Sequence, residues 1–152
     1  MKLTTVCYIE NDGKYLMLNR NKKQNDENGG KWIGIGGKFE HGESPHDCIR
    51  REVLEETGLT LLKPRYRGII TFVSNVWGTE YMHLFTCSEY TGELVSECDE
   101  GDLDWVKISD LSTLPMWEGD KIFHEILLRE NRFFSLKLVY DGDNLVSHTV
   151  EY

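Results

Sequence analysis

The stretch that decides the fold runs from Gly37 to Leu59 and reads GKFEHGESPHDCIRREVLEETGL. Ser44 and Pro45 are typical of a helix start, because serine can cap a helix and proline suits its first turn. Asp47 completes a capping box with Ser44. Gly58 is a natural helix stop. The stretch therefore predicts one helix that follows Ser44 and ends at Gly58.

The predicted helix carries several acids close together. At about 100° per residue, Glu52, Glu55 and Glu56 fan across an arc of roughly 100° on one side of the helix. Such carboxylates repel one another, and hard oxygen ligands of this kind suit Mg²⁺ or Mn²⁺, of which Mg²⁺ usually partners substrate phosphates. Arg51 lies four residues before Glu55 and is placed to orient it. The competing interpretation is an amphipathic helix whose glutamate-rich face is simply solvated.

The full spacing of the stretch favours the metal-binding interpretation. It resembles the Nudix box, G-x5-E-x7-R-E-U-x-E-E-x-G-U with U aliphatic, at every specified position. The matching residues are Gly37, Glu43, Arg51, Glu52, Val53, Glu55, Glu56, Gly58 and Leu59. From average residue usage, a chance match in a chain of this length is on the order of one in ten million. The resemblance implies an α/β fold, a Nudix-type α/β/α sandwich with a mixed β-sheet between helices.

Length and composition agree with an enzyme domain of this kind. The chain has 152 residues, 39% hydrophobic residues and a net charge of −9. We expect one hydrolase domain over residues 1–152. The acidic balance argues against a stable nucleic-acid partner, since side chains that bind phosphate backbones need a basic face. The expected partner is a small nucleotide, whose phosphates divalent metal ions can bridge to an acidic protein.

The cysteines and termini predict a cytoplasmic protein. The four cysteines form no CxxC pair, which favours free thiols in a reducing cytosol. The N-terminus MKLTTVCYIE alternates like a strand and lacks a signal-peptide core. No apolar run approaches the roughly 20 residues that span a membrane, so we expect no membrane partner. The oligomeric state stays open between monomer and homodimer.

Periodicity and turn residues predict the remaining elements. Residues 3–10 and 14–20 read as a hairpin around Asn11-Asp12-Gly13. Residues 19–31 read as a polar loop, and 32–37 as a short strand that breaks into a glycine turn. After the box helix we expect the strands 65–74, 80–89 and 102–108, a helix over 116–130, and a last hairpin formed by 133–140 and 145–150.

The similarity extends beyond the box to the MutT-type branch, and most to the oxidised-purine nucleoside triphosphate diphosphatases. Short segments spread over the chain carry it: Lys31-Trp32, Gly34, Gly36-Gly37-Lys38, Glu97 with Asp99-Glu100, and Met116-Trp117. The likeness implies a Mg²⁺-dependent hydrolase (Mn²⁺ is the alternative) that cleaves a phosphoanhydride bond of a nucleoside diphosphate linked to a group X. A purine nucleoside triphosphate, oxidised or not, would give a monophosphate and pyrophosphate.

Site residues follow from the resemblance by position. The Gly36 carbonyl with Glu52, Glu55 and Glu56 would hold the metal, and Glu100 would ligate it or act as a base. The general base stays open among Glu56, Glu52, Glu55 and Glu100, because relatives differ. Arg51 and Glu43 would support the glutamates. Lys38, and Lys23 in the loop, would meet phosphates, although a solvated loop lysine is the competing interpretation for Lys23.

The base pocket is where the chain departs from these relatives. They carry an asparagine where this chain has Ile33, and two adjacent aspartates where it has Gly119 and Asp120. Trp117 would stack on a base with Phe72 as a second wall, the alternative being that both rings belong to the core. Replacing an amide and a carboxylate removes hydrogen bonds worth on the order of 1–3 kcal/mol each. A preference for 8-oxo-dGTP therefore stays open.

Two other functions remain compatible with the sequence. The same chemistry on dinucleotide polyphosphates, nucleotide sugars or RNA 5′ ends is one, and a noncatalytic nucleotide-binding module is the other. Noncatalytic relatives usually lose box glutamates, and this chain keeps them all.

Overall fold

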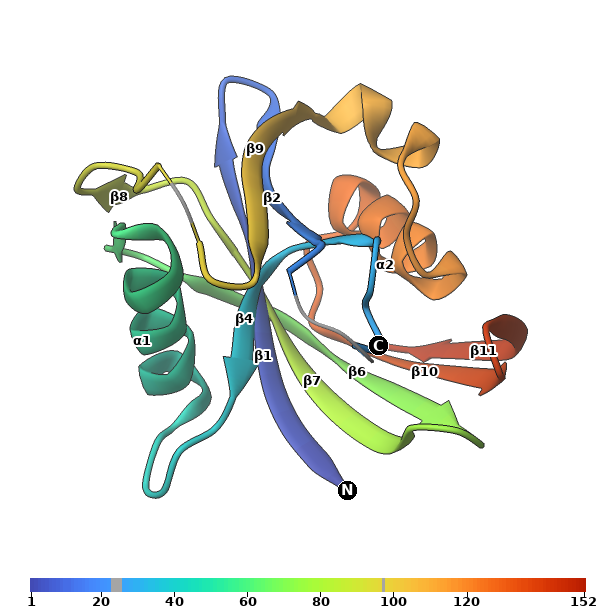
Figure 1. The fold of residues 1–152 in the computed structure, drawn as a ribbon. Helices are drawn as coiled ribbons and strands as arrows, with labels where there is room; N and C mark the ends of the chain where they lie inside the picture. Colours follow the sequence, from blue (N-terminus) through green and yellow to red (C-terminus); the bar gives the residue numbers. More distant parts are fainter. Residues whose placement is uncertain (23–25, 97) are drawn as a thin grey trace.

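The computed structural model describes residues 1–22, 26–96 and 98–152, and it places a mixed β-sheet between two helices (Figure 1). The elements follow one another along the chain as β1 (Lys2–Asn11), β2 (Lys14–Arg20), β3 (Trp32–Ile33), β4 (Ile35–Lys38), α1 (Pro45–Thr57), β5 (Thr60–Leu61), β6 (Arg65–Ser74), β7 (Gly78–Cys87), β8 (Tyr90–Thr91), β9 (Gly101–Lys107), a short 3-10 helix η1 (Ile108–Thr113), α2 (Glu118–Arg129), β10 (Phe134–Asp141) and β11 (Asn144–Glu151).

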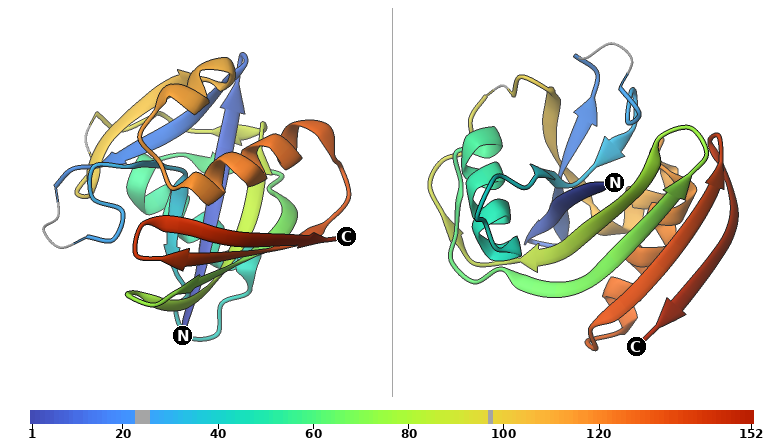
Figure 2. Two further views of the ribbon diagram at one scale, coloured as in Figure 1. Left: turned by 90° about the vertical axis from the view of Figure 1, so that its right-hand side faces the viewer. Right: turned by 90° about the horizontal axis from the view of Figure 1, so that it is seen from below.

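The central strand β1 is apolar on both faces, and this dictates the layers. Val6 and Tyr8 pack into one hydrophobic core, while Cys7 and Ile9 pack into a second. Successive side chains of a strand point to opposite faces, so both faces of the sheet must be covered. Helix α1 lies on one side and α2 on the other, as the views from the front and from below show (Figures 1 and 2). The predicted α/β/α sandwich is confirmed.

The sheet combines parallel and antiparallel pairs. Its strand order is β11-β10-β6-β7-β1-β2-β3, with β4 paired to β1 and β9 paired to β2. The β1–β7 and β6–β10 pairs are parallel. The two predicted hairpins are present, and the first closes through Asp12 and Gly13 at φ 53° and 73°. Positive φ at both central residues is what a two-residue hairpin turn of this hand requires.

Three details of the predicted elements were wrong. The segment Ile35–Lys38 is a strand, β4, rather than a glycine turn, and it pairs antiparallel with β1. A Cβ at Gly36 would lie 1.9 Å from the carbonyl oxygen of Thr5, so glycine there permits close strand approach instead of a bend. Strand β7 begins at Gly78, two residues early, and the short elements β5, β8 and η1 had no periodic signal.

Helix α1 forms as its end residues predict. Ser44 Oγ accepts from the Asp47 backbone N–H at 3.1 Å, and an Asp47 carboxylate oxygen accepts from the Ser44 N–H at 3.1 Å. Gly58 ends the helix in the left-handed region at φ 80°. Ile49 and Val53 are fully buried and seat the helix on the sheet. Both helices are short, and among the described residues no helix is long and apolar enough to cross a bilayer.

We expect Ser44→Ala to lower the free energy of unfolding by about 1 kcal/mol, because it leaves a first-turn N–H of α1 without its acceptor. Urea denaturation followed by circular dichroism measures this. Ser44→Asp is the matched control, since an aspartate restores the acceptor and should keep the wild-type midpoint. Equal midpoints for Ser44→Ala and wild type would show that the cap contributes nothing.

Candidate active site between α1 and β4

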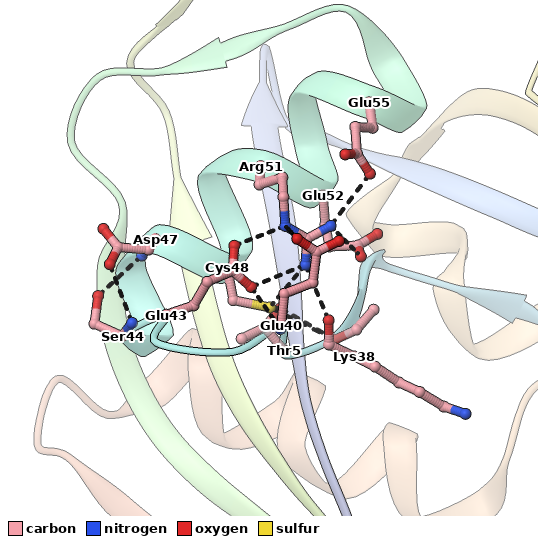
Figure 3. A network of polar contacts seen from close by, with 11 residues as sticks. Thr5, Lys38, Glu40, Glu43, Ser44, Asp47, Cys48, Arg51, Glu52 and Glu55 are labelled. Atoms are coloured by element: carbon pink, nitrogen blue, oxygen red, sulfur yellow. Dashed lines mark hydrogen bonds and ion pairs between the residues drawn. The ribbon is translucent and has the colours of Figure 1, made fainter.

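Arg51 is the centre of a polar network that joins α1 to the segment before it (Figure 3). Its Nε and Nη2 donate to the two Glu43 oxygens at 2.7 and 3.0 Å. Its Nη1 donates to Glu52 at 2.9 Å and to Glu55 at 3.2 Å, and Nη2 also donates to the Lys38 carbonyl at 3.0 Å. These partners raise the pKa of Arg51 further above its usual range, while Arg51 lowers the pKa of Glu43. The predicted orienting contact to Glu55 is present, as one of several.

Glu56 is in a very different environment from its neighbours on the helix. Its Oε2 is buried and has no hydrogen-bond partner in the described part of the chain. Burial, a side-chain hydrogen bond with Glu100 and the charges of Glu100 and Glu52 raise the pKa of Glu56 strongly. Glu55, by contrast, is 58% exposed at the side chain. The three acids therefore do not share one solvated face, and among the described residues the charge of Arg20 opposes the raised pKa of Glu56 only in part.

The donor set fits a divalent cation. The acids that meet near the end of β4 offer only oxygen, which suits Mg²⁺ or Mn²⁺. The partnerless Oε2 of Glu56 is the atom that such a cation would satisfy. Within residues 1–22, 26–96 and 98–152, no three acidic, histidine or cysteine side chains stand in a ready-made coordination arrangement. Arg51 explains part of this, because it draws Glu52 and Glu55 into ion pairs with itself.

The sequence analysis did not identify Arg20, which comes from β2 and contacts the acids Glu100 and Asp26. Its Nη1 donates to Glu100 Oε2 at 3.0 Å, and its Nε donates to Asp26 Oδ2 at 2.8 Å. The register of β2 against β9 pairs Arg20 with Gly101, which places Glu100 beside it. The sequence signal that could have identified Arg20 is its position at the end of a predicted strand, immediately before a polar loop.

A cavity of about 510 Å³ begins at these acids and runs along the sheet. It brings together most of the predicted site residues, namely Ile33, Gly36, Lys38, Glu52, Phe72, Glu100, Trp117 and Asp120. Glu55 and Glu56 are not among its lining residues. Lys23 and Glu97 lie outside the described residues.

Aromatic rings and a buried acid form the far end of the cavity. The Trp117 indole meets the Tyr140 ring edge-on at 5.0 Å between centroids, and its Nε1 donates to Asn28 Oδ1 at 2.8 Å. The Lys31 ammonium lies over the Trp117 ring, 4.3 Å from its centroid. Phe72 lines the cavity and also packs against the core, so both interpretations of this ring hold in part.

Asp120 is the least solvated acid of this end. Only 5% of the residue is exposed, and its Oδ1 has no hydrogen-bond partner among the described residues. Burial, with a smaller contribution from Glu80, raises the pKa of Asp120 to about 8, against the opposing effect of Lys31. The cavity thus has acids at both ends and apolar rings at the Asp120 end.

The NUDIX domain family model matches residues 2–126 of the chain. The chain belongs to the Nudix family. It is 32% identical over 152 residues to the oxidized purine nucleoside triphosphate hydrolase of Danio rerio, covering 99% of this chain and 94% of that protein. It is 36% identical over 124 residues to an uncharacterized Nudix hydrolase, YvcI, of Bacillus subtilis (strain 168), covering 79% and 75% of the two chains.

The solved structures include a MutT protein from Bacillus halodurans that superposes with a TM-score of 0.89 at 29% identity. The match covers 99% of this chain and 98% of that one. The fold and the family therefore agree with the resemblance drawn from the Nudix box, and the protein is a MutT-like Nudix hydrolase.

A second aspartate at position 119, beside Asp120, would require the side chains of Leu138 and Tyr140 to move. A Cβ at Gly119 would lie 2.5 Å from Leu138 Cδ1 and 2.7 Å from the Tyr140 hydroxyl. The Gly119 backbone N–H donates to that hydroxyl at 2.7 Å. The tyrosine therefore fills the space that a side chain at position 119 would need, and Asp120 is left as the acid contributed by α2 to the cavity.

We expect the contribution of Asp120 to stability to fall as pH rises between about 4 and 8, because folded Asp120 keeps a proton that the unfolded chain has lost. The slope contributed by this one group reaches at most about 1.4 kcal/mol per pH unit. Asp120→Asn removes this pH-dependent contribution, so the stability of the variant relative to the wild type should increase as the pH rises toward about 8. Urea unfolding at several pH values measures the difference, and parallel pH profiles for the two proteins would contradict it.

Proposed function

We propose that this protein is a Mg²⁺-dependent hydrolase that converts a purine nucleoside triphosphate and water to a nucleoside monophosphate and pyrophosphate, with residues 1–152 acting as one domain. The observation that carries the proposal is the buried oxygen of Glu56, which has no partner among the described residues and interacts with Glu52 and Glu100. Glu52 and Glu100 line one end of a cavity whose other end holds Trp117 and Asp120. The named activity of the Danio rerio relative supports the triphosphate substrate.

The acids would bind the cation and activate water. The Gly36 carbonyl with Glu52, Glu55, Glu56 and Glu100 would hold Mg²⁺, or Mn²⁺ in its place. The bound ion neutralises phosphate oxygens and lowers the pKa of the attacking water. One carboxylate of this set takes the proton of that water, and Glu56, Glu52, Glu55 and Glu100 all remain candidates.

Positive side chains on the cavity wall would position the phosphates. Lys38 follows the glycines of β4 and lines the cavity, and its side chain points away from the Arg51 network (Figure 3). Arg20 lines the cavity and already contacts Glu100. Arg51 instead holds Glu52 and Glu55 in place, because its hydrogen bonds all go to the protein. Trp117 and Phe72 would enclose the base.

A nucleotide panel tests the substrate. We expect pyrophosphate release from dGTP, 8-oxo-dGTP or dATP that requires Mg²⁺ and stops with EDTA. The panel also contains pyrimidine triphosphates, a diadenosine polyphosphate, a nucleotide sugar and a 5′-triphosphate RNA. Hydrolysis confined to these last three would replace the triphosphate proposal with the alternative substrates, and hydrolysis of none would favour a nucleotide-binding module.

We expect Glu56→Gln to lower turnover by about 100-fold or more, because it removes a charge that the cation and the attacking water depend on. Glu125→Gln, at an exposed acid on α2, is the control and should keep wild-type turnover. A second measurement is the melting temperature, which Mg²⁺ should raise in the wild type and raise less in Glu56→Gln. Unchanged turnover together with unchanged Mg²⁺ stabilisation would refute the assignment of Glu56.

A further inference from the structure

Glu80 is a second acid in the cavity that lies outside the Nudix box. It comes from β7, where it pairs in register with Lys2 of β1 and Phe72 of β6, and it lines the same cavity as Asp120 of α2. Two carboxyl groups thus enter the base end of the cavity from two separate elements, the sheet and the helix. Their mutual charge contributes to the raised pKa of Asp120.

The hydrogen bonds of Glu80 leave most of its accepting capacity unused. The Thr4 hydroxyl donates to Oε2 at 2.7 Å, and this is the one hydrogen bond that the Glu80 side chain makes within the described part of the chain. An ionised carboxylate has about four lone-pair sites, so Thr4 fixes its orientation without saturating it. The side chain is only partly buried and lines the cavity, so its remaining acceptor sites are accessible to a ligand bound there.

A structural ion pair does not account for Glu80. Its neighbour across the strands, Lys2, pairs with Glu27 instead. Lys2 and Lys38 still favour the ionised form of Glu80, while burial and Glu27 oppose it and raise the pKa of this carboxyl. The charges around Glu80 come from β1, β4 and the turn at residues 26–30, and from Asp120 on α2. Glu80 is therefore a carboxyl held in place by Thr4, without a direct ion pair among the described residues.

The chemistry that satisfies both acids is an N–H donor on a flat ring. Trp117, Phe72 and Tyr140 supply aromatic walls, and Asp120 Oδ1 is a buried acceptor without a partner. The Glu80 carboxylate and Asp120 Oδ1 offer acceptors, so a ligand with N–H donors complements them. An exocyclic amino group of a purine brings two N–H bonds on the edge of a flat base.

We propose that Glu80, oriented by Thr4, accepts a hydrogen bond from the exocyclic amino group of the purine base and so selects aminopurine nucleotides over counterparts that lack this amino group. The inference rests on the proposed function, because it assumes that the cavity holds a purine nucleotide. Glu80 acts as a specificity-determining residue, and Thr4 as a positioning residue that acts through it.

Matched nucleotides that differ by one amino group test the inference. dGTP is compared with dITP, and dATP with purine deoxyriboside triphosphate, by kcat/KM for pyrophosphate release. Binding of the corresponding monophosphates is followed by calorimetry, so that a readout exists besides turnover. In the wild type, loss of the amino group should lower kcat/KM by about tenfold or more in one of the two nucleotide pairs, as expected for a hydrogen bond to a charged group. We call this ratio of kcat/KM values the amino-group cost.

Variants at Glu80 assign that cost to this side chain. In Glu80→Met, which has no acceptor of this kind, the kcat/KM values of the two nucleotides in that pair should differ by no more than about twofold. Glu80→Gln keeps an accepting oxygen and should lie between, and it answers the question if the methionine variant does not fold. Thr4→Val should also reduce the cost. Glu125→Gln removes an exposed carboxyl outside the cavity and should leave the cost as in the wild type.

Two results would overturn the inference while the proposed function stands. One is an equal amino-group cost in wild type and folded Glu80→Met, and the other is no such cost in either nucleotide pair. Absence of hydrolysis of every purine triphosphate by the wild type would instead overturn the proposed function. Monophosphate binding separates the two cases, because it depends on the base pocket and not on turnover.

Discussion

The site depends on one guanidinium group. Arg51 binds Glu43 before α1, Glu52 and Glu55 on α1, and the Lys38 carbonyl at the end of β4. These contacts tie the helix to the strand that brings Gly36 and Gly37 against β1 and Glu52. A Cβ at Gly37 would lie 2.5 Å from the Glu52 carboxyl carbon, so the strand passes directly over that carboxylate. Without Arg51, mutual repulsion would drive these acids apart.

Because Arg51 is shared among several acids, it leaves one of them less compensated. Glu56 is buried, and Glu100 beside it adds negative charge that raises its pKa. Arg20 forms ion pairs with Glu100 and Asp26, and its charge opposes this rise only in part. Arg51 therefore compensates Glu52 and Glu55 by direct ion pairs, whereas the compensation of Glu56 is weaker and indirect. This division explains why sequence spacing alone, which groups Glu52, Glu55 and Glu56 together, does not distinguish their roles.

Local signals in the sequence were sufficient for α1 and the two hairpins, because Ser44, Gly58 and the Asp12-Gly13 turn act through neighbours in the chain. The box motif also identified the acids near the metal end. Contacts that depend on strand register could not be predicted from the sequence. Arg20 meets Glu100 only because β2 pairs with β9, and Thr4 meets Glu80 only because β1 pairs in parallel with β7. Lys23 stays a prediction, since it lies outside the described residues.

A buried carboxyl group lies in or beside each end of the cavity, its burial costs free energy, and this indicates the kind of ligand that binds there. Glu56, which interacts with the cavity-lining acids Glu52 and Glu100, and Asp120 at the other end each hold a buried oxygen without a partner among the described residues. Arg20 and Lys31 oppose the raised pKa values of these two acids only in part. Folding therefore maintains two buried carboxyl groups at a local loss of stability, of the kind expected where function requires it. A ligand that combines a divalent cation, a polyphosphate and a donor-bearing base relieves both ends at once, whereas a metal ion alone relieves only the first.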